Sequence, residues 1–211
     1  MAHDMYPQER PFLSPELMVR AYAAGIFPMS EGADDPSVFW VDPQRRGVFP
    51  LDGFHMSRSL RKRIRRGGYS VGINRDFMGV VEGCADRAPT WINGDLERCY
   101  LALHTQGLAH SVEIFDHDGL IGGVFGVTIG AAFFGESMFS RKPDGSKLAL
   151  AHLIQRLRVG GFTLFDTQFV TDHLQTMGAI EIARSDYRAE LSHALMLPAD
   201  FMALPEDAPL L

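Results

Sequence analysis

The stretch from residue 109 to residue 140 constrains the fold most, because it carries strand-like runs separated only by short turns. The runs cover Ser111 to Phe115, Leu120 to Ile129 and Ala131 to Met138, and Asp116-His117-Asp118-Gly119 supplies the first turn. Strands joined this closely can pair only with their neighbours in antiparallel fashion. The pattern therefore predicts an antiparallel meander whose faces other elements must cover.

Helical signals dominate on both sides of this meander. Ser14-Pro15 is a typical helix start, with a capping hydroxyl and proline at the first position, and Gly25 follows as a stop. Further helices are expected at residues 57–66, 76–85, 96–105, 146–159 and 172–177 and from residue 186, and further strands at 69–73 and 162–165. Strands that cluster beneath helices predict an α+β class. The region of residues 29–50, which holds glycines, several prolines and acidic residues, is expected to be an ordered loop. A boundary near Pro43 would separate a small N-terminal domain (1–43) from a larger domain (44–211).

Composition narrows the class of protein. The 211 residues carry a formal net charge of −6, which argues against a uniformly basic nucleic-acid coat but allows local basic patches. Cys84 and Cys99 have neither zinc-site nor disulfide-framework spacing and are expected as free thiols. Residues 1–8 lack a signal-peptide pattern and no stretch approaches the roughly 20 apolar residues of a membrane span, so we expect a cytoplasmic protein without membrane contact.

Polar residues interrupt two apolar strands. Asp166 and Gln168 follow the run Phe162 to Phe165, and a period of two places them on one face of the strand; Glu136 lies among apolar residues in 131–140. A carboxylate can fix a carboxamide that then binds an amine or an oxyanion. The structural alternatives are that Asp166 caps a turn and Gln168 is solvated, and that Glu136 is a polar group at a hinge beside Gly135.

Other chemistry has weaker support. Gly135-Glu136-Ser137 resembles the start of the nucleophile elbow of serine hydrolases, with His110, His152 or His173 as conceivable bases, but the second glycine is missing and apolar residues continue. The histidines lack metal-site spacing, so no metal is expected.

A basic stripe occupies the predicted helix at residues 57–66. Its cations recur at spacings of three and four without an intervening acid, namely Arg58, Arg61, Lys62, Arg65 and Arg66. Like charges at i,i+4 repel each other by a few tenths of a kcal/mol, so a polyanionic partner such as nucleic acid is favoured over a merely solvated face.

A series of ordered sequence blocks along nearly the whole chain resembles the leucyl/phenylalanyl-tRNA–protein transferase family. The blocks are Tyr22-Ala23-Ala24-Gly25-Ile26-Phe27-Pro28, His55 to Lys62, Glu82-Gly83-Cys84-Ala85, Thr90-Trp91-Ile92, Ala109 to Glu113, Gly122 to Val127, Gly135 to Ser140 and Asp166-Thr167-Gln168. The resemblance implies transfer of Leu or Phe from aminoacyl-tRNA to the α-amino group of proteins that begin with Arg or Lys, which marks them for degradation in the bacterial N-degron pathway.

The same resemblance implies a fold. The larger domain would be GNAT-like (acetyltransferase-like), with a mixed, largely antiparallel sheet and a small N-terminal domain packed on it. The pyrophosphate loop of acetyltransferases has no clear counterpart, since the nearest stretch, Arg158 to Thr163, ends differently. We therefore expect no coenzyme A and no other cofactor.

The resemblance also implies roles for site residues. Asp166 would orient Gln168, which would hold the attacking amine or stabilise the tetrahedral intermediate, and Glu136 would bind a cationic group of the acceptor or help accept its proton. The aminoacyl side chain would enter a pocket formed by Met29, Val124, Phe133, Leu153 and Leu157, with Trp91 and Tyr100 beside the terminal adenosine. The tRNA acceptor stem would lie on Arg58, Arg61, Lys62 and Arg65.

Among the departures of the chain from the family pattern, two concern aromatic positions. Met29 stands where the family usually has Trp, and Phe39-Trp40 where it often has Trp-Trp. A methionine gives a softer pocket wall, which leaves the preference among Leu, Phe and Met open. A non-catalytic module that binds aminoacyl-tRNA or basic N-terminal peptides is the main alternative function.

Overall fold

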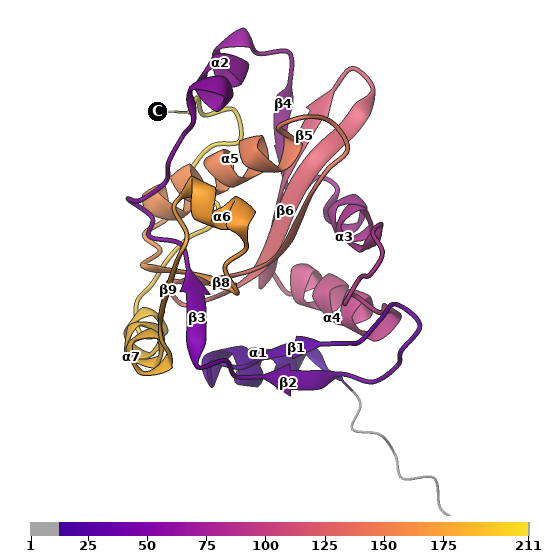
Figure 1. Ribbon diagram of the computed structural model, residues 1–211, viewed down its shortest axis with the longest axis vertical. Helices are drawn as coiled ribbons and strands as arrows, with labels where there is room; N and C mark the ends of the chain where they lie inside the picture. Colours follow the sequence, from indigo (N-terminus) through magenta and orange to yellow (C-terminus); the bar gives the residue numbers. More distant parts are fainter. Residues whose placement is uncertain (1–12, 211) are drawn as a thin grey trace, which may run out of the picture.

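A seven-stranded sheet forms the centre of the computed structural model, which describes residues 13–210 (Figure 1). The strand order is β4-β5-β6-β7-β8-β3-β9. The strands are β3 (Arg45–Val48), β4 (Ser70–Ile73), β5 (Ala109–Asp116), β6 (Gly119–Ile129), β7 (Ala132–Ser140), β8 (Leu164–Gln168) and β9 (Ile180–Ala183). Within residues 13–210, β7 and β8 pair in parallel and every other neighbouring pair in this sheet is antiparallel.

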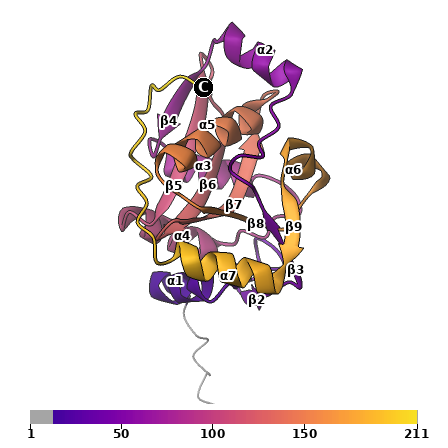
Figure 2. The same cartoon turned by 90° about the vertical axis from the view of Figure 1, so that its left-hand side faces the viewer.

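Helices cover both faces of this sheet and create two apolar cores (Figure 2). The first core lies under α1 (Pro15–Ala23), α3 (Phe77–Ala85), α4 (Gly94–Thr105) and α7 (Arg184–Ala194). The second lies under α2 (Arg58–Arg66), α5 (Gly145–Val159) and α6 (Asp172–Met177). Alternate residues of a strand point to opposite faces, so neighbours such as Phe133 and Phe134 enter different cores.

The N-terminal layer consists of α1 and a ribbon of β1 (Phe27–Met29) and β2 (Phe39–Val41). Helix α1 begins as the sequence predicts, because the Ser14 hydroxyl accepts a hydrogen bond from the Leu17 amide at 3.2 Å and Pro15 opens the helix. The next strand, β3, already belongs to the large sheet. The domain boundary near Pro43 remains a prediction.

The expected α+β class and antiparallel meander are confirmed. The expected loop of residues 29–50 contains β2 and β3, whose three or four residues are too few to show a period. The last long strand continues through Gln168 rather than ending near Phe165. No helix among the described residues is long and apolar enough to cross a bilayer. Residues 1–8, on which the absence of a leader was predicted, lie outside the described part.

Candidate active site

Glu136 lies at a β-bulge. Along the β6–β7 pair, Phe125 faces Ser137 and Gly126 faces Gly135, so Glu136 is an extra residue without a partner on β6. A bulge turns the extra side chain away from the regular alternation of the strand. Glu136 points to the first core, on the same face as Phe134 two residues earlier, and the facing of the strand changes after it, where Met138 packs against the second core. Glu136 is only 7% exposed.

Gly126 makes this bulge possible. A Cβ atom at that position would lie 2.3 Å from the Phe134 carbonyl oxygen and 2.5 Å from the Phe133 ring. Any larger residue would force β6 and β7 apart where they must stay close. Close packing of β6 against β7 therefore explains why a glycine stands at position 126.

Three donors surround the Glu136 carboxylate. The Tyr22 hydroxyl donates to Oε1 at 2.7 Å, the Tyr100 hydroxyl donates to Oε2 at 2.6 Å, and Gln168 Nε2 donates to Oε1 at 3.2 Å. Burial raises the pKa of Glu136 to about 7, even though these hydrogen bonds act in the opposite direction. Burial and the nearby Glu136 charge raise the pKa of both tyrosines, which keeps their hydroxyls protonated as donors.

Gln168 lies at a second bulge, in β8. Gly47 of β3 faces Gln168 and Val48 faces Asp166, which leaves Thr167 as the extra residue. Gln168 adopts a left-handed backbone conformation, with φ of 64°, and is only 8% exposed. Gly47 accommodates this bulge, because a Cβ there would lie 2.7 Å from the Phe169 carbonyl carbon and 2.8 Å from Thr167 Oγ1.

The two bulges lie where β7 and β8 separate. Parallel pairing of these strands ends at Phe134 and Asp166, two residues before Glu136 and Gln168. Beyond that point the Glu136–Gln168 hydrogen bond joins the strands through side chains. Diverging strands that each present a polar side chain next to a core form a place where a substrate group can be held between them.

Asp166 is fully buried and paired. Arg46 Nε donates to Oδ1 at 2.9 Å, Arg46 Nη2 donates to Oδ2 at 2.6 Å, and the Tyr187 hydroxyl donates to Oδ2 at 2.7 Å. Oδ1 also accepts from the Gln168 backbone N–H at 2.8 Å. The turn-capping bond of the structural alternative is thus present, but it is one of four bonds. Asp166 contacts the backbone of Gln168, and the carboxamide bonds to Glu136.

The predicted pocket residues divide between the two faces of the sheet. Met29, Trp91 and Tyr100 belong to the first core or pack against it. The second core contains the other predicted residues, Val124, Phe133, Leu153 and Leu157, each at most 4% exposed. The structure does not bring Met29 into one pocket with these four side chains.

Trp91 and Tyr100 are neighbours, with ring centroids 6.4 Å apart. Tyr100 is completely buried and packs edge-on against Phe125, so neither of its ring faces is open to a base. Trp91 is only partly buried. Of the two residues predicted to flank the adenosine, Trp91 retains exposed surface.

The serine hydrolase alternative is wrong. Ser137 lies inside β7, which continues to Ser140, and not at the sharp strand-to-helix turn that a nucleophile elbow requires. Its hydroxyl accepts a hydrogen bond from Arg87 at 3.3 Å. The two cysteines are free, as expected from their spacing, and both are buried.

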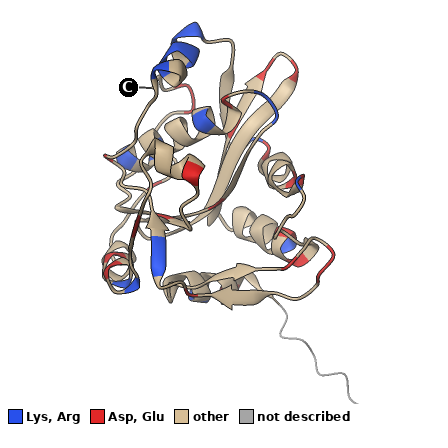
Figure 3. Cartoon of the chain, in the orientation of Figure 1, with Lys and Arg blue, Asp and Glu red and all other residues tan. Residues whose placement is uncertain are grey.

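Lys and Arg make up most of α2 (Figure 3). The cations of the stripe are exposed, whereas Arg63, on the same helix, is partly buried. Ser57 caps the helix as expected, and Leu60 anchors it in the second core. Within residues 13–210, no ion pair involves the cations of the stripe, Arg58, Arg61, Lys62, Arg65 and Arg66. Unpaired cations on one helix form a suitable surface for phosphate groups.

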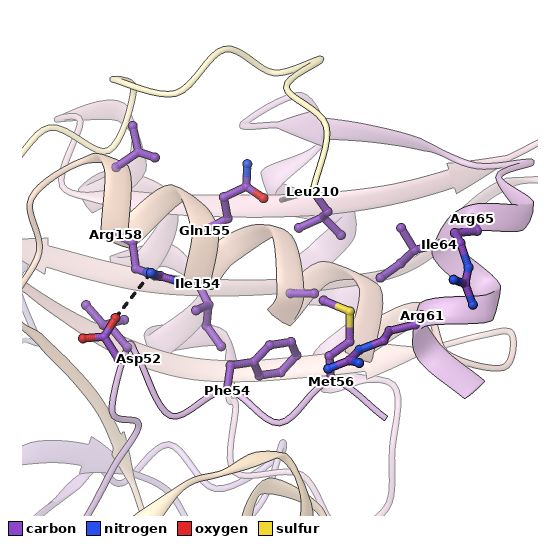
Figure 4. Close-up of a pocket in the computed structure, with 13 residues that line it drawn as sticks. Asp52, Phe54, Met56, Arg61, Ile64, Arg65, Ile154, Gln155, Arg158 and Leu210 are labelled. Carbon is purple, nitrogen blue, oxygen red and sulfur yellow. Dashed lines mark ion pairs between the residues drawn. The ribbon is translucent and has the colours of Figure 1, made fainter. Parts of the chain in front are cut away.

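A pocket of about 770 Å³ lies between α2 and α5, and residues of both helices line it (Figure 4). Arg61 and Arg65 line it from α2, Ile154 contributes part of its apolar wall, and Arg158 pairs with Asp52 at 3.4 Å. Glu136 and Gln168 do not line this pocket. This pocket and the buried carboxylates are therefore separate features of the molecule.

Comparison with known proteins identifies the family. The model of the leucyl/phenylalanyl-tRNA protein transferase family matches residues 48–192, and the model of the corresponding N-terminal domain matches residues 13–44. The chain belongs to this family. The leucyl/phenylalanyl-tRNA--protein transferase of Jannaschia sp. (strain CCS1) is 80% identical over 210 residues, which cover 100% of this chain and 99% of that protein. Its namesake from Ruegeria pomeroyi is 62% identical over 93% of this chain and 94% of its own length.

As a member of the leucyl/phenylalanyl-tRNA protein transferase family, the chain is an aminoacyltransferase, as the sequence blocks predict. Among solved structures, FemX covers 82% of this chain and 70% of its own, at 12% identity and a TM-score of 0.47.

Sequence reasoning about this transferase missed Arg46 and Tyr187 and did not assign Tyr22 to the site. A buried aspartate needs a partner, and that requirement points to an arginine on a neighbouring strand. Tyr187 and Leu191 are four residues apart on the buried side of α7, so helical periodicity could have found Tyr187. The position of Tyr22 one α1 turn after Met18 gives a similar signal.

Proposed function

We propose that this protein transfers leucine or phenylalanine from aminoacyl-tRNA to the α-amino group of proteins that begin with Arg or Lys, and that Glu136 and Gln168 lie at the reaction centre. The observation that supports the location most is the buried hydrogen bond between these two side chains at the point where β7 and β8 separate. Family membership supports the reaction class.

The proposed chemistry needs little activation. The neutral α-amine attacks the ester carbonyl carbon of the aminoacyl-tRNA, a peptide bond forms, and the bond from that carbon to the ribose oxygen breaks. The proton lost by the amine is transferred to the ribose oxygen, which leaves as a hydroxyl group. An α-amine with a pKa near 8 has a useful neutral fraction at physiological pH, so positioning of the two substrates carries most of the rate.

Gln168 is the proposed orienting group for the amine. Its Nε2 donates to Glu136. In the opposite orientation of the carboxamide, its oxygen would face the Glu136 carboxylate, which accepts from Tyr22 and Tyr100 and has no hydrogen to donate. The carboxamide therefore presents Oε1 away from Glu136, where it can accept an N–H of the attacking amine. In this arrangement Glu136 fixes the orientation of the Gln168 carboxamide, a role that the family resemblance gave to Asp166.

Further parts of the proposal concern the substrates and the setting. The tRNA acceptor stem would lie along α2, where the predicted contacts Arg58, Arg61, Lys62 and Arg65 are exposed. The aminoacyl side chain would enter between four side chains of the second core, for which a cavity must open: Val124, Phe133, Leu153 and Leu157. The preference among Leu, Phe and Met stays open, and Met29, which packs against the first core, does not line this cavity. We further propose a GNAT-like large domain, a cytoplasmic setting and a reaction without coenzyme A.

A transfer assay tests the function directly. The protein is incubated with Phe-tRNA that carries labelled Phe and with three model proteins that differ only in a first residue of Arg, Lys or Ala. Label on the Arg and Lys proteins alone is expected. Binding of Phe-tRNA without label on any acceptor would instead establish the non-catalytic binding module, and label on the Ala protein would contradict the acceptor rule.

A matched variant links this assay to the site. Gln168→Ala removes the carboxamide, and Gln175→Ala removes the same group from the exposed helix α6. The proposal expects transfer to fall at least tenfold in the first variant, about 1.4 kcal/mol of barrier, and to stay unchanged in the second. Equal rates in the two variants would remove Gln168 from the reaction centre.

A further inference from the structure

We propose that Arg46 is a positioning residue for aminoacyl transfer, which acts on Gln168 through Asp166. This inference rests on the proposed function and adds to it a residue that neither the sequence blocks nor the family comparison assigns. Arg46 lies on β3, next to β8 in the sheet, and is only 1% exposed. It is among the largest fully buried side chains of residues 13–210.

The guanidinium of Arg46 is fixed on every side. Its edge meets both carboxylate oxygens of Asp166, and Nη1 donates to the Gly25 carbonyl at 2.9 Å. Its Cζ lies over two aromatic rings, 4.5 Å from the Phe27 centroid and 4.4 Å from the Tyr187 centroid. A planar cation in a fixed fork suits bidentate and stacked contacts, which a lysine ammonium cannot reproduce.

Asp166 transmits this fixed geometry to Gln168. Oδ1 of Asp166 accepts from Arg46 Nε at 2.9 Å and from the Gln168 backbone N–H at 2.8 Å. Gln168 holds a left-handed conformation that residues other than glycine adopt only when the surroundings enforce it. The backbone bond to an immobilised carboxylate supplies that enforcement, and the conformation determines where the carboxamide lies relative to Glu136.

The buried ion pair therefore has a use other than stability. Isolated buried ion pairs contribute little net stability, because desolvation of both charges offsets their attraction. Here donors from Arg46, Tyr187 and the Gln168 backbone occupy all the strong acceptor positions of the Asp166 carboxylate. Asp166 then serves as a fixed acceptor for the backbone and not as a proton carrier in the transfer step.

Arg46→Lys is the decisive variant, since it keeps the charge but loses the fork. Arg45→Lys is its matched control, because Arg45 is the preceding residue of the same strand and is exposed. Single-turnover rate constants are measured with folded protein in saturating excess over labelled Phe-tRNA and with a peptide that begins with Arg. Such a rate constant does not depend on the folded fraction, so it separates positioning from a loss of folded protein.

Arg46→Lys is expected to lower this rate constant at least tenfold with unchanged affinity for Phe-tRNA, and Arg45→Lys to change neither. If Arg46→Lys does not fold, Tyr187→Phe removes one donor to Asp166 Oδ2 and should lower the rate constant at least threefold. A rate constant within twofold of the wild-type value in whichever variant is folded would overturn the proposal.

A second readout does not depend on transfer. In ¹⁵N-labelled protein, the backbone and side-chain amide signals of Gln168 should shift in Arg46→Lys, or in Tyr187→Phe where the lysine variant does not fold, and stay in place in Arg45→Lys. Unmoved Gln168 signals would overturn the positioning role even if the rate fell. Absence of transfer by the wild-type protein would instead refute the proposed function, and the amide signals would still decide the structural link from Arg46 to Gln168.

Discussion

Arg46 and Asp166 meet through two parallel hydrogen bonds of 2.9 and 2.6 Å, with at most 1% of either side chain exposed. The pair joins β3 to β8 at the position where β8 also borders the parallel strand β7. Burial lowers the pKa of Arg46, but the hydrogen bond and charge of Asp166 outweigh burial and leave that pKa raised. The charged pair is therefore part of the folded core.

Asp166→Ala is expected to reduce the free energy of unfolding by about 3–5 kcal/mol, because it leaves Arg46 as an uncompensated buried charge. Activity alone would then confuse misfolding with chemistry. Urea unfolding measures the loss. Asp42→Ala, which breaks the partly exposed pairs with Arg184 and Arg188, should cost no more than about 1 kcal/mol; an equal loss in the two variants would refute the special role of burial.

The transfer rate is expected to rise with pH through about 7, because burial raises the pKa of Glu136 to about 7 and only the ionised carboxylate accepts from Gln168 in the observed way. Tyr100→Phe removes a hydrogen bond that lowers this pKa, so the rise should move to higher pH. Glu136→Gln should abolish it and leave only the titration of the acceptor amine. Single-turnover rates from about pH 6 to about pH 9 check this, and identical profiles for wild type and Glu136→Gln would contradict it.

The same carboxyl makes stability depend on pH. Its pKa in the folded protein exceeds the value of about 4.3 for an unfolded chain. Between these two values the folded state binds more protons, so this group's contribution to the free energy of unfolding falls as pH rises. Urea unfolding across this range should show a decline in wild type that is absent in Glu136→Gln. Glu190→Gln, on the exposed side of α7, should retain the wild-type decline.

Charge reversal on α2 should weaken tRNA binding in a salt-dependent manner. Arg61→Glu with Arg65→Glu removes two exposed cations, so the slope of log affinity against log salt should decrease by about 1–2. The matched double variant Arg20→Glu with Arg98→Glu changes the same charge on α1 and α4, which lie away from α2 in Figure 1. Filter-binding titrations at several salt concentrations provide the measurement; equal effects of the two variants would show only a general charge effect.

Gly47→Ala should disturb the bulge that carries Gln168. The new Cβ would lie 2.7 Å from the Phe169 carbonyl carbon, which is backbone and cannot move aside cheaply. Overpacking of this kind costs about 1–3 kcal/mol in the free energy of unfolding. Gly32→Ala adds the same methyl group where nothing lies within 4 Å and should change stability by at most about 0.5 kcal/mol. Urea unfolding of both variants compares the two positions.

Regular elements followed from the sequence more readily than the contacts between them. The meander and the helices from Ser14 and Ser57 have strong local signals, namely strand spacing and capping residues. Strands β1, β2, β3 and β9 have three or four residues each, which is too short for a period to emerge. Their pairing depends on partners far along the chain, so local patterns could not supply it.

The site shows the same division. Asp166, Gln168 and Glu136 stand out because they interrupt apolar strands, and the structure brings Gln168 into contact with both carboxylates. The two bulges shift the register by one residue each, which a simple alternation cannot anticipate. For that reason the sequence could not indicate that Asp166 holds the backbone of Gln168 and Glu136 its side chain. The place of Met29 depends on how the separate β1–β2 ribbon packs on the first core, which no local pattern supplies.

The contact between Tyr22 of α1 and Glu136 of β7 limits how this chain can be recombined with its relatives. One family model ends at residue 44 and the next begins at residue 48, which suggests a convenient junction for chimaeras. Yet Tyr22 and Gly25 lie before that junction, and their hydrogen-bond partners Glu136 and Arg46 lie outside the first model's range. An exchanged N-terminal segment must therefore supply a donor for Glu136 and an acceptor for Arg46. Segments from two relatives can be combined only when these two contacts are kept.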